Sequence, residues 1–296
     1  MPQGTLTKFV RHPTEALAAA ILFCLFRILP IDWASGLAGG LARSIGPKLG
    51  VSSRARRNIK HALPELNERE RETVVRDMWD NLGRVVGEYP HMGRLHAKGA
   101  GNRLEIIGAD FIDQLRDDDK PGVFMMAHLG NWEFSGLASS QRGLAVDRVY
   151  RQANNRLTEW ILSQGRASIE GALIQKGPAG AKQILSSLRA GNHLALLVDQ
   201  KMNDGIPVPF FGVDAMTAPA LAQLALRLKC PVVPVRVKRL KGANFQVIVS
   251  PPIEYRMSGD RQADVLAYMT EINAIIESWI RATPGQWLWL HNRWPK

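Results

Sequence analysis

Strand-like segments that alternate with helix-like segments fill the chain after residue 120, and this alternation restricts the fold more than any other feature. Short segments rich in strand-forming residues occur at 122–127, 147–151, 194–199, 231–237 and 245–250. Stretches with helical character occur at 133–140, 155–163, 179–189, 218–228 and 261–281. Strands that alternate with helices in this way predict an α/β domain with a mainly parallel or mixed sheet.

The first 95 residues lack this alternation and predict helices. Residues 16–26 are eleven apolar residues in a row, fewer than the roughly 20 that a simple membrane-spanning helix needs. An amphipathic pattern follows, because apolar residues recur every fourth position from Trp33 to Ile45. No acidic residue interrupts the basic stretch from Arg43 to Lys60.

An apolar segment, an amphipathic helix and a basic flank together favour association of residues 1–50 with an anionic membrane surface. The alternative is a buried N-terminal helix followed by a solvated basic face. We expect residues 51–296 to form a single domain, helical over 51–95 and with its sheet starting at about residue 104.

The charge balance favours an anionic partner. Lys and Arg number 38 against 27 Asp and Glu, which gives a formal charge of +11. Such a charge suits nucleic acid, a phospholipid surface or an acidic protein. Two cysteines cannot build a disulfide framework or a thiolate zinc site. The sequence contains no phosphate-binding loop, dinucleotide motif or recognised nucleic-acid-binding motif, so we expect no cofactor, no metal and no nucleic-acid partner.

The end of the first strand-like segment carries a candidate catalytic group. His128 leaves the apolar strand, Leu129 and Gly130 suggest a turn, and Glu133 falls in the first turn of the next helix. If the turn brings the two side chains together, Glu133 can orient the imidazole so that His128 takes a proton from an alcohol. The backbone N–H groups of Gly130 and Asn131 are candidate donors to an oxyanion. The alternative is a structural histidine that caps the turn.

Polar residues at other element ends are candidate substrate contacts. Asp199 and Gln200 close an apolar strand, where side chains of an open α/β sheet face its ligand crevice. Asp199 could equally cap the following loop. Arg151 ends the strand at 147–151 and Arg166 follows a helix, and guanidinium groups suit phosphate recognition. Single arginines are also common as solvated surface residues.

These residues resemble a known family. The segment HLGNWE at 128–133 resembles the His-x4-Asp/Glu motif of glycerolipid-type (lysophospholipid) acyltransferases, in the form found in the late acyltransferases of lipid A biosynthesis. Further similar segments follow in family order over nearly the whole chain: 149–151, 165–166, 197–200, 208–212, 216–219, 231–235 and 287–294. Asn292 departs from the pattern, since relatives often carry a basic residue there.

The resemblance implies a mixed sheet flanked by helices and a helical N-terminal region that associates with the membrane. It implies transfer of a fatty acyl chain from acyl carrier protein to a hydroxyl of a lipid A precursor, in lipopolysaccharide biosynthesis at the cytoplasmic face of the inner membrane. His128 would be the general base and Glu133 its charge partner, with no cofactor. Substrate-binding roles would fall on Asn131, Arg151, Arg166, Asp199 and Gln200.

Other functions remain compatible with the pattern. The same superfamily includes an actinobacterial acyltransferase for phosphatidylinositol mannosides that shares HLGNWE, and a lysophospholipid is a further possible acceptor. A nucleic-acid-binding protein would explain the charge, and a membrane-bound hydrolase could use the same dyad with water.

Overall fold

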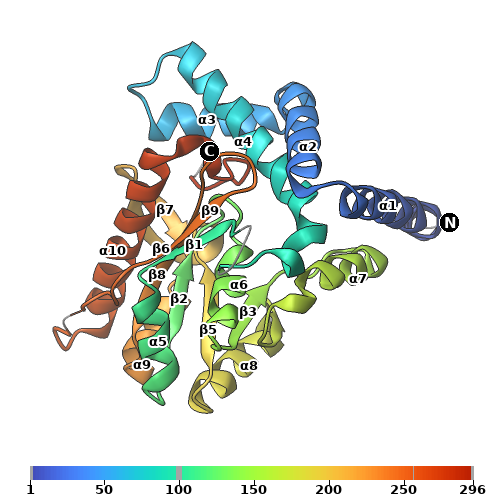
Figure 1. The fold of residues 1–296 in the computed structure, drawn as a ribbon. Coiled ribbons are helices and arrows are strands. Elements are labelled where there is room, and N and C mark those ends of the chain that lie inside the picture. Colours follow the sequence, from blue (N-terminus) through green and yellow to red (C-terminus); the bar gives the residue numbers. More distant parts are fainter. Residues whose placement is uncertain (1–2, 98–101, 256, 295–296) are drawn as a thin grey trace.

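A seven-stranded mixed sheet forms the centre of the molecule (Figure 1). The computed structural model describes residues 3–97, 102–255 and 257–294. The strand order is β1-β9-β8-β2-β5-β3-β4, and every neighbouring pair is parallel except the antiparallel pair β8–β9. The strands are β1 (Leu104–Ile107), β2 (Val123–Met126), β3 (Val146–Tyr150), β4 (Leu173–Gln175), β5 (His193–Leu197), β8 (Val232–Arg239) and β9 (Phe245–Val249). The prediction of an α/β fold with a mainly parallel or mixed sheet is confirmed, and all five expected strands are present.

Strand β2 lies inside the sheet and positions the candidate base. All four of its residues are buried, because β5 and β8 flank it and helices cover both of its faces. Met126 pairs with Leu197 in the parallel register of β2 and β5. The segments that follow these two residues therefore leave the sheet side by side at its carboxyl edge.

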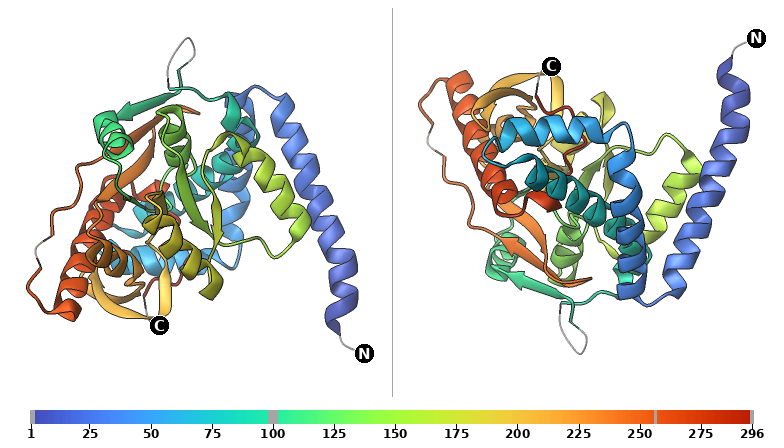
Figure 2. Two further views of the ribbon diagram at one scale, coloured as in Figure 1. Left: turned by 90° about the horizontal axis from the view of Figure 1, so that it is seen from below. Right: turned by 90° about the horizontal axis from the view of Figure 1, so that it is seen from above.

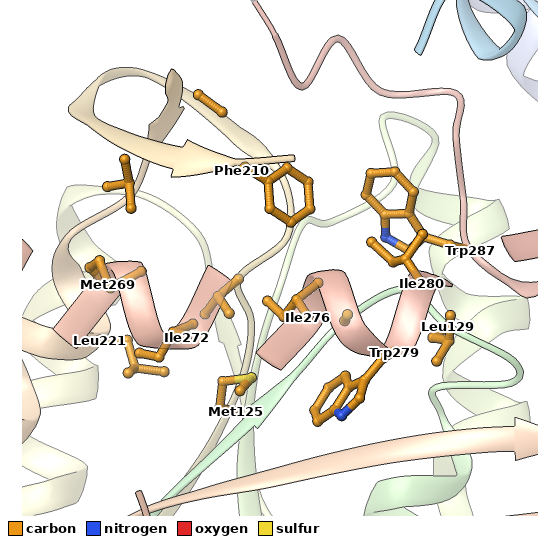
Figure 3. Close-up of a cluster of buried hydrophobic side chains, with 14 of the residues drawn as sticks. Met125, Leu129, Phe210, Leu221, Met269, Ile272, Ile276, Trp279, Ile280 and Trp287 are labelled. Carbon is orange, nitrogen blue, oxygen red and sulfur yellow. The ribbon is translucent and has the colours of Figure 1, made fainter. Parts of the chain in front are cut away.

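Alternate residues of β2 contribute to two separate cores, as the two-residue period of a strand requires. Met125 packs in a cluster with α9 (Ala220–Leu228) and α10 (Arg261–Ala282). Figure 3 shows Met125 beside Ile272 and Ile276 of α10. Phe124 packs on the other face with α5 (Ala109–Asp117) and α6 (Phe134–Gln141). The sheet is thus enclosed between two helical layers.

Four helices precede the sheet: α1 (Gln3–Ile28), α2 (Ile31–Ile45), α3 (Ser52–Ala62) and α4 (Glu68–Glu88). Helix α4 starts at a capping box in which Asn67 and Glu70 bond reciprocally. Helical structure was expected over 51–95, and α4 is α-helical to Glu88, after which the chain continues as the 3-10 helix η2 (Tyr89–Arg94), which contains Pro90. Proline lacks an N–H and so cannot extend the α-helical hydrogen bonds.

Helix α1 reaches outward past α7 (Arg156–Gly165), as both views of Figure 2 show. None of the helices in the described part of the chain is long and apolar enough to cross a bilayer.

Two elements after the fifth strand complete the carboxyl edge of the sheet. A hairpin of β6 (Lys201–Phe210) and β7 (Val213–Thr217) starts directly after Gln200. The tryptophan-rich segment after α10 packs inside the molecule, since Trp287 and Trp289 are 1% and 0% exposed. These tryptophans therefore belong to the core. Within the described structure the segment contributes an isolated bridge between Leu129 and Trp287.

Candidate active site

The carboxylate that contacts His128 is Asp199. The imidazole Nδ1 donates to Asp199 Oδ1 at 2.8 Å, and the backbone N–H of His128 donates to Asp199 Oδ2 at 2.9 Å. The parallel register of β2 and β5 explains the pairing, since both residues lie two positions beyond the paired Met126 and Leu197. A carboxylate on Nδ1 holds the proton on that nitrogen and leaves the Nε2 lone pair available to accept another.

Asp199 is ionised in spite of complete burial. Its side chain has no exposed surface, and burial alone would raise the pKa of the carboxyl group. The positive field of a protonated His128 and three N–H donors, two from His128 and one from the Trp287 indole at 2.8 Å, outweigh burial. They hold the pKa of Asp199 well below its usual range. A fixed negative charge therefore lies beside His128 at neutral pH.

The opposite edge of the His128 ring faces two further polar side chains. The Gln200 amide donates to His128 Nε2 at 3.3 Å and to His291 Nε2 at 3.0 Å. Burial, and next the positive charge of His128, lower the pKa of His291 to about 4. His291 is thus neutral at pH 7. Trp132 packs its edge on the His128 ring at a centroid distance of 5.0 Å. His128 keeps 13% of its side chain exposed.

Hydrogen bonds with the segment after α10 hold the turn that carries His128 in place. Leu288 N–H donates to the His128 carbonyl at 3.1 Å, and Gly130 N–H donates to the Gln286 carbonyl at 3.0 Å. Gly130 has φ of +59°, and a Cβ there would lie 2.2 Å from the Val237 carbonyl oxygen. Only glycine fits this turn.

The two predicted oxyanion donors differ in whether their N–H groups are already hydrogen-bonded. The N–H of Gly130 is already occupied by Gln286, so the expectation that it is free to bind an oxyanion is wrong for this structure. The N–H of Asn131 has no hydrogen-bond partner within the described residues and lies just before α6. Of the two, only Asn131 N–H is not already bonded in the described structure, and the residue is fully buried.

Glu133 bonds away from His128. Its carboxylate accepts three hydrogen bonds from Arg166, at 2.7 to 3.2 Å, and one from the Tyr89 hydroxyl at 3.4 Å. Burial by itself would lower the pKa of Arg166, but the bonds from Glu133 raise it above its usual range. Glu133 therefore bonds to Arg166 and Tyr89 and not to His128, contrary to the expectation from the sequence. The turn at Gly130 directs Glu133 toward η2 and α7 rather than back to the imidazole.

Asn131 and Arg151 were predicted to contact substrate, and the structure brings neither to His128 through its side chain. The Asn131 side chain is 0% exposed and donates to Glu88 at 2.9 Å. It would have to move before it touched a substrate. Arg151 lies exposed after β3 and makes no hydrogen bond or ion pair with any residue that the structure describes.

A buried ion pair supports the turn that carries His128. Glu88 of α4, which is fully buried, pairs with Arg239 of β8. Asn81 joins them, since it accepts from Arg239 Nε at 2.8 Å and donates to the Gly130 carbonyl at 3.0 Å. Burying two charges is favourable only when further hydrogen bonds satisfy them. Here Asn81 bonds to the Gly130 carbonyl and Asn131 bonds to Glu88, so the ion pair is linked to the loop that carries His128.

Sequence reasoning missed His291 and the Glu88–Arg239 pair. His128 and Asp199 were both expected at strand ends, but their pairing depends on the order of the strands. His291 lies in the similar segment 287–294, where no role was predicted for it, and no local pattern marks Glu88 or Arg239. In the described parts of the chain no cluster of three or more histidine, cysteine or acidic residues could hold a metal ion.

Comparison with known proteins gives consistent matches. The sequence profile of a family described as "Bacterial lipid A biosynthesis acyltransferase" matches residues 5–296. A "Lipid A biosynthesis acyltransferase" of Haemophilus influenzae is 25% identical over 90% of this chain and 83% of its own length. From Escherichia coli, a "Lipid A biosynthesis palmitoleoyltransferase" is 24% identical over 84% of this chain and 83% of its own. A "Lipid A biosynthesis myristoyltransferase" of the same species is 22% identical over 96% and 88%.

Proposed function

This chain belongs to the bacterial lipid A biosynthesis acyltransferase family and is an acyltransferase, and we propose that it transfers a fatty acyl chain from acyl carrier protein to a hydroxyl of a lipid A precursor. His128 is the general base in this proposal. The observation that carries it is the His128–Asp199 pair, which presents an imidazole with an unprotonated Nε2 at the carboxyl edge of the sheet.

The chemistry follows from this pair. The acceptor hydroxyl takes the place of the Gln200 amide at His128 Nε2 and gives its proton to that nitrogen while its oxygen attacks the thioester carbonyl carbon. The charge of Asp199 stabilises the imidazolium that forms. As the tetrahedral intermediate collapses, the C–S bond breaks and the carrier thiol leaves with the proton from His128. No acyl-enzyme is needed.

The oxyanion requires a donor that is not already bonded. Asn131 N–H is not bonded within the described residues and lies three residues from His128. Because Asn131 is fully buried, the turn must shift before this N–H can reach the oxyanion. Neutral His291 and Gln200 border the same space and are suited to hold the acceptor hydroxyl. Glu133 and Arg166 stay in the proposal as a charged pair that shapes the wall formed by η2 and α7.

The N-terminal helices supply a route to a lipid substrate. Four apolar side chains on α2 are 50% to 67% exposed: Trp33, Leu37, Leu41 and Ile45. Leu17, Ile21 and Ile28 of α1 are 58% to 80% exposed. Such a surface favours a lipid interface over water. We therefore include attachment of this region to the cytoplasmic face of the inner membrane in the proposal.

The test uses purified protein, an acyl carrier thioester and a lipid A precursor, with the product read by mass spectrometry. His128→Ala should lower kcat by about 10²–10⁴, the usual contribution of a general base. His96→Ala, which changes an exposed histidine, is the matched control. Thioester loss without an acylated acceptor would instead identify a hydrolase. Mass spectra of lipid A from cells with and without the gene would then give the length and position of the chain.

A further inference from the structure

A groove between α3 and the first half of α4 lies outside the catalytic turn. Its volume is about 1080 Å³. Two glutamates and one threonine contribute to its lining, and the other five lining residues are basic: Arg56, Lys60, Arg69, Arg71 and Arg76. No apolar side chain lines it.

The walls of the groove are fixed to each other. Arg56 of α3 bonds to both carboxylate oxygens of Glu72 of α4, at 2.8 and 2.9 Å. This pair neutralises one acid and joins the two helices. Lys60, Arg69 and Arg76 have no ion pair within the described residues. A rigid groove therefore presents several uncompensated positive charges, which reduces the ordering cost of binding an acidic partner.

Helix α3 connects this groove to the catalytic site. On its other side, Asn58 donates to the carbonyls of Trp289 and His291, at 2.8 and 2.6 Å. Arg54 donates to the Leu290 carbonyl at 3.0 Å. Helix α3 thus lines the groove and also bonds to the segment after α10, which holds the His128 turn.

We propose that the groove between α3 and α4 is the docking surface for the acidic protein that delivers the acyl thioester. This inference rests on the proposed function, which makes an acyl carrier protein the donor. A concave, polar and basic groove fits an acidic helix of a protein. A membrane surface is flat, and the exposed apolar residues that would insert into it lie on α1 and α2.

The charges in the groove should act mainly on association. Exposed ion pairs at a binding surface each contribute about 1.4- to 5-fold to affinity. A Lys60→Ala, Arg69→Ala, Arg76→Ala variant should therefore raise KM for the acyl carrier thioester about tenfold and change kcat less than twofold. The wild-type affinity for the carrier should fall as salt is added, whereas that of the variant should depend on salt much less.

A control with the same loss of charge is available at the other end of the molecule. Lys182, Arg189 and Arg227 are exposed on α8 (Pro178–Arg189) and α9, far from α3 in Figure 1. Their triple alanine variant should leave KM for the carrier thioester within twofold of wild type. An acyl pantetheine thioester, which lacks the protein part of the donor, should give the same KM with all three proteins.

A direct measurement of carrier binding tests the docking surface independently of the proposed function. Labelled acyl carrier protein is titrated onto each protein in low salt, and binding to phospholipid vesicles is measured in parallel. Loss of carrier binding in the groove variant alone supports the docking surface even if no transfer to lipid A precursor is detected. Unchanged carrier binding and KM overturn it. Loss of vesicle binding, with KM raised for both donors, also overturns it and assigns the groove to the membrane.

Discussion

Asp199→Asn tests which carboxylate serves His128. The two oxygens of Asp199 accept three N–H bonds: Oδ1 from His128 Nδ1, and Oδ2 from the His128 backbone and the Trp287 indole. Asparagine has one carbonyl oxygen. If this oxygen keeps the two bonds at the Oδ2 position, the amide group faces Nδ1 and the ring proton must move to Nε2. The opposite orientation leaves two buried N–H groups unpaired, at about 1–3 kcal/mol each.

The expected loss follows from the burial of the pair. The Asp199→Asn substitution would both favour the tautomer in which Nε2 cannot accept a proton and remove the counter-charge of the imidazolium. Removing one partner of a buried charge pair costs about 3–5 kcal/mol. At about 1.4 kcal/mol per factor of ten, kcat should fall by about 10²–10⁴. Glu133→Gln makes the same chemical change at a carboxylate that bonds to Arg166 and not to His128, so kcat should fall less than tenfold.

The assay is steady-state transfer from a saturating acyl carrier thioester, with kcat and KM for both variants and wild type. Thermal unfolding of each protein separates a catalytic loss from a loss of folded enzyme. A larger fall in kcat for Glu133→Gln than for Asp199→Asn would refute the argument from hydrogen bonding. The carboxylate at position 133 would then be the one that acts on the base.

Three further results are expected. Leu37→Ser should weaken partition into anionic vesicles about tenfold, since a buried leucine contributes roughly 1.5–3 kcal/mol, whereas Leu266→Ser on α10 should not; equal effects would contradict membrane contact through α2. His291 is neutral in the fold with a pKa of about 4 against 6.5 when unfolded, so the unfolded chain takes up its proton first and stability should decline as pH falls from 6.5 to 4. His291→Gln should reduce this slope by at most about 1.4 kcal/mol per pH unit, measured by urea unfolding. Arg239→Met leaves Glu88 buried without its cation and should lower the free energy of unfolding by about 3–5 kcal/mol; a stability equal to wild type would show that the Glu88–Arg239 pair does not stabilise the fold.

The sequence predicted the inner strands well because burial makes them distinctive. Residues 123–126 are apolar on both faces, which is typical of a strand covered by helices. By contrast, β4 has only three residues, one of them polar, so it contains no readable period. Strand β1 starts at Leu104, where the sheet was expected to begin. Hairpin β6–β7 was also missed, since the polar residues 202–205 interrupt β6 and continuous pairing with β7 begins only at Ile206.

The candidate site was predicted residue by residue but not pair by pair. His128, Asp199 and Gln200 come together because their strands are neighbours, and strand order is not a local property of the sequence. Glu133 was paired with His128 because a turn at Leu129 and Gly130 was expected to bring the two side chains together, and because the segment resembles a known motif. The positive φ at Gly130, set by close approach to Val237, redirects the chain in between, and only the fold supplies that contact.

The dependence of His128 on Gln286, Trp287 and His291 has a consequence for the order in which the protein matures on the ribosome. The strands, His128 and Asp199 are all translated long before these three residues. Folding during synthesis proceeds from the N-terminal side, so a sheet can form while the turn at Gly130 still lacks its bonds. Acyl transfer competence should therefore arise in one late step. A chain halted before Gln286 would carry every residue of the His128–Asp199–Gln200 group and still be inert toward the thioester.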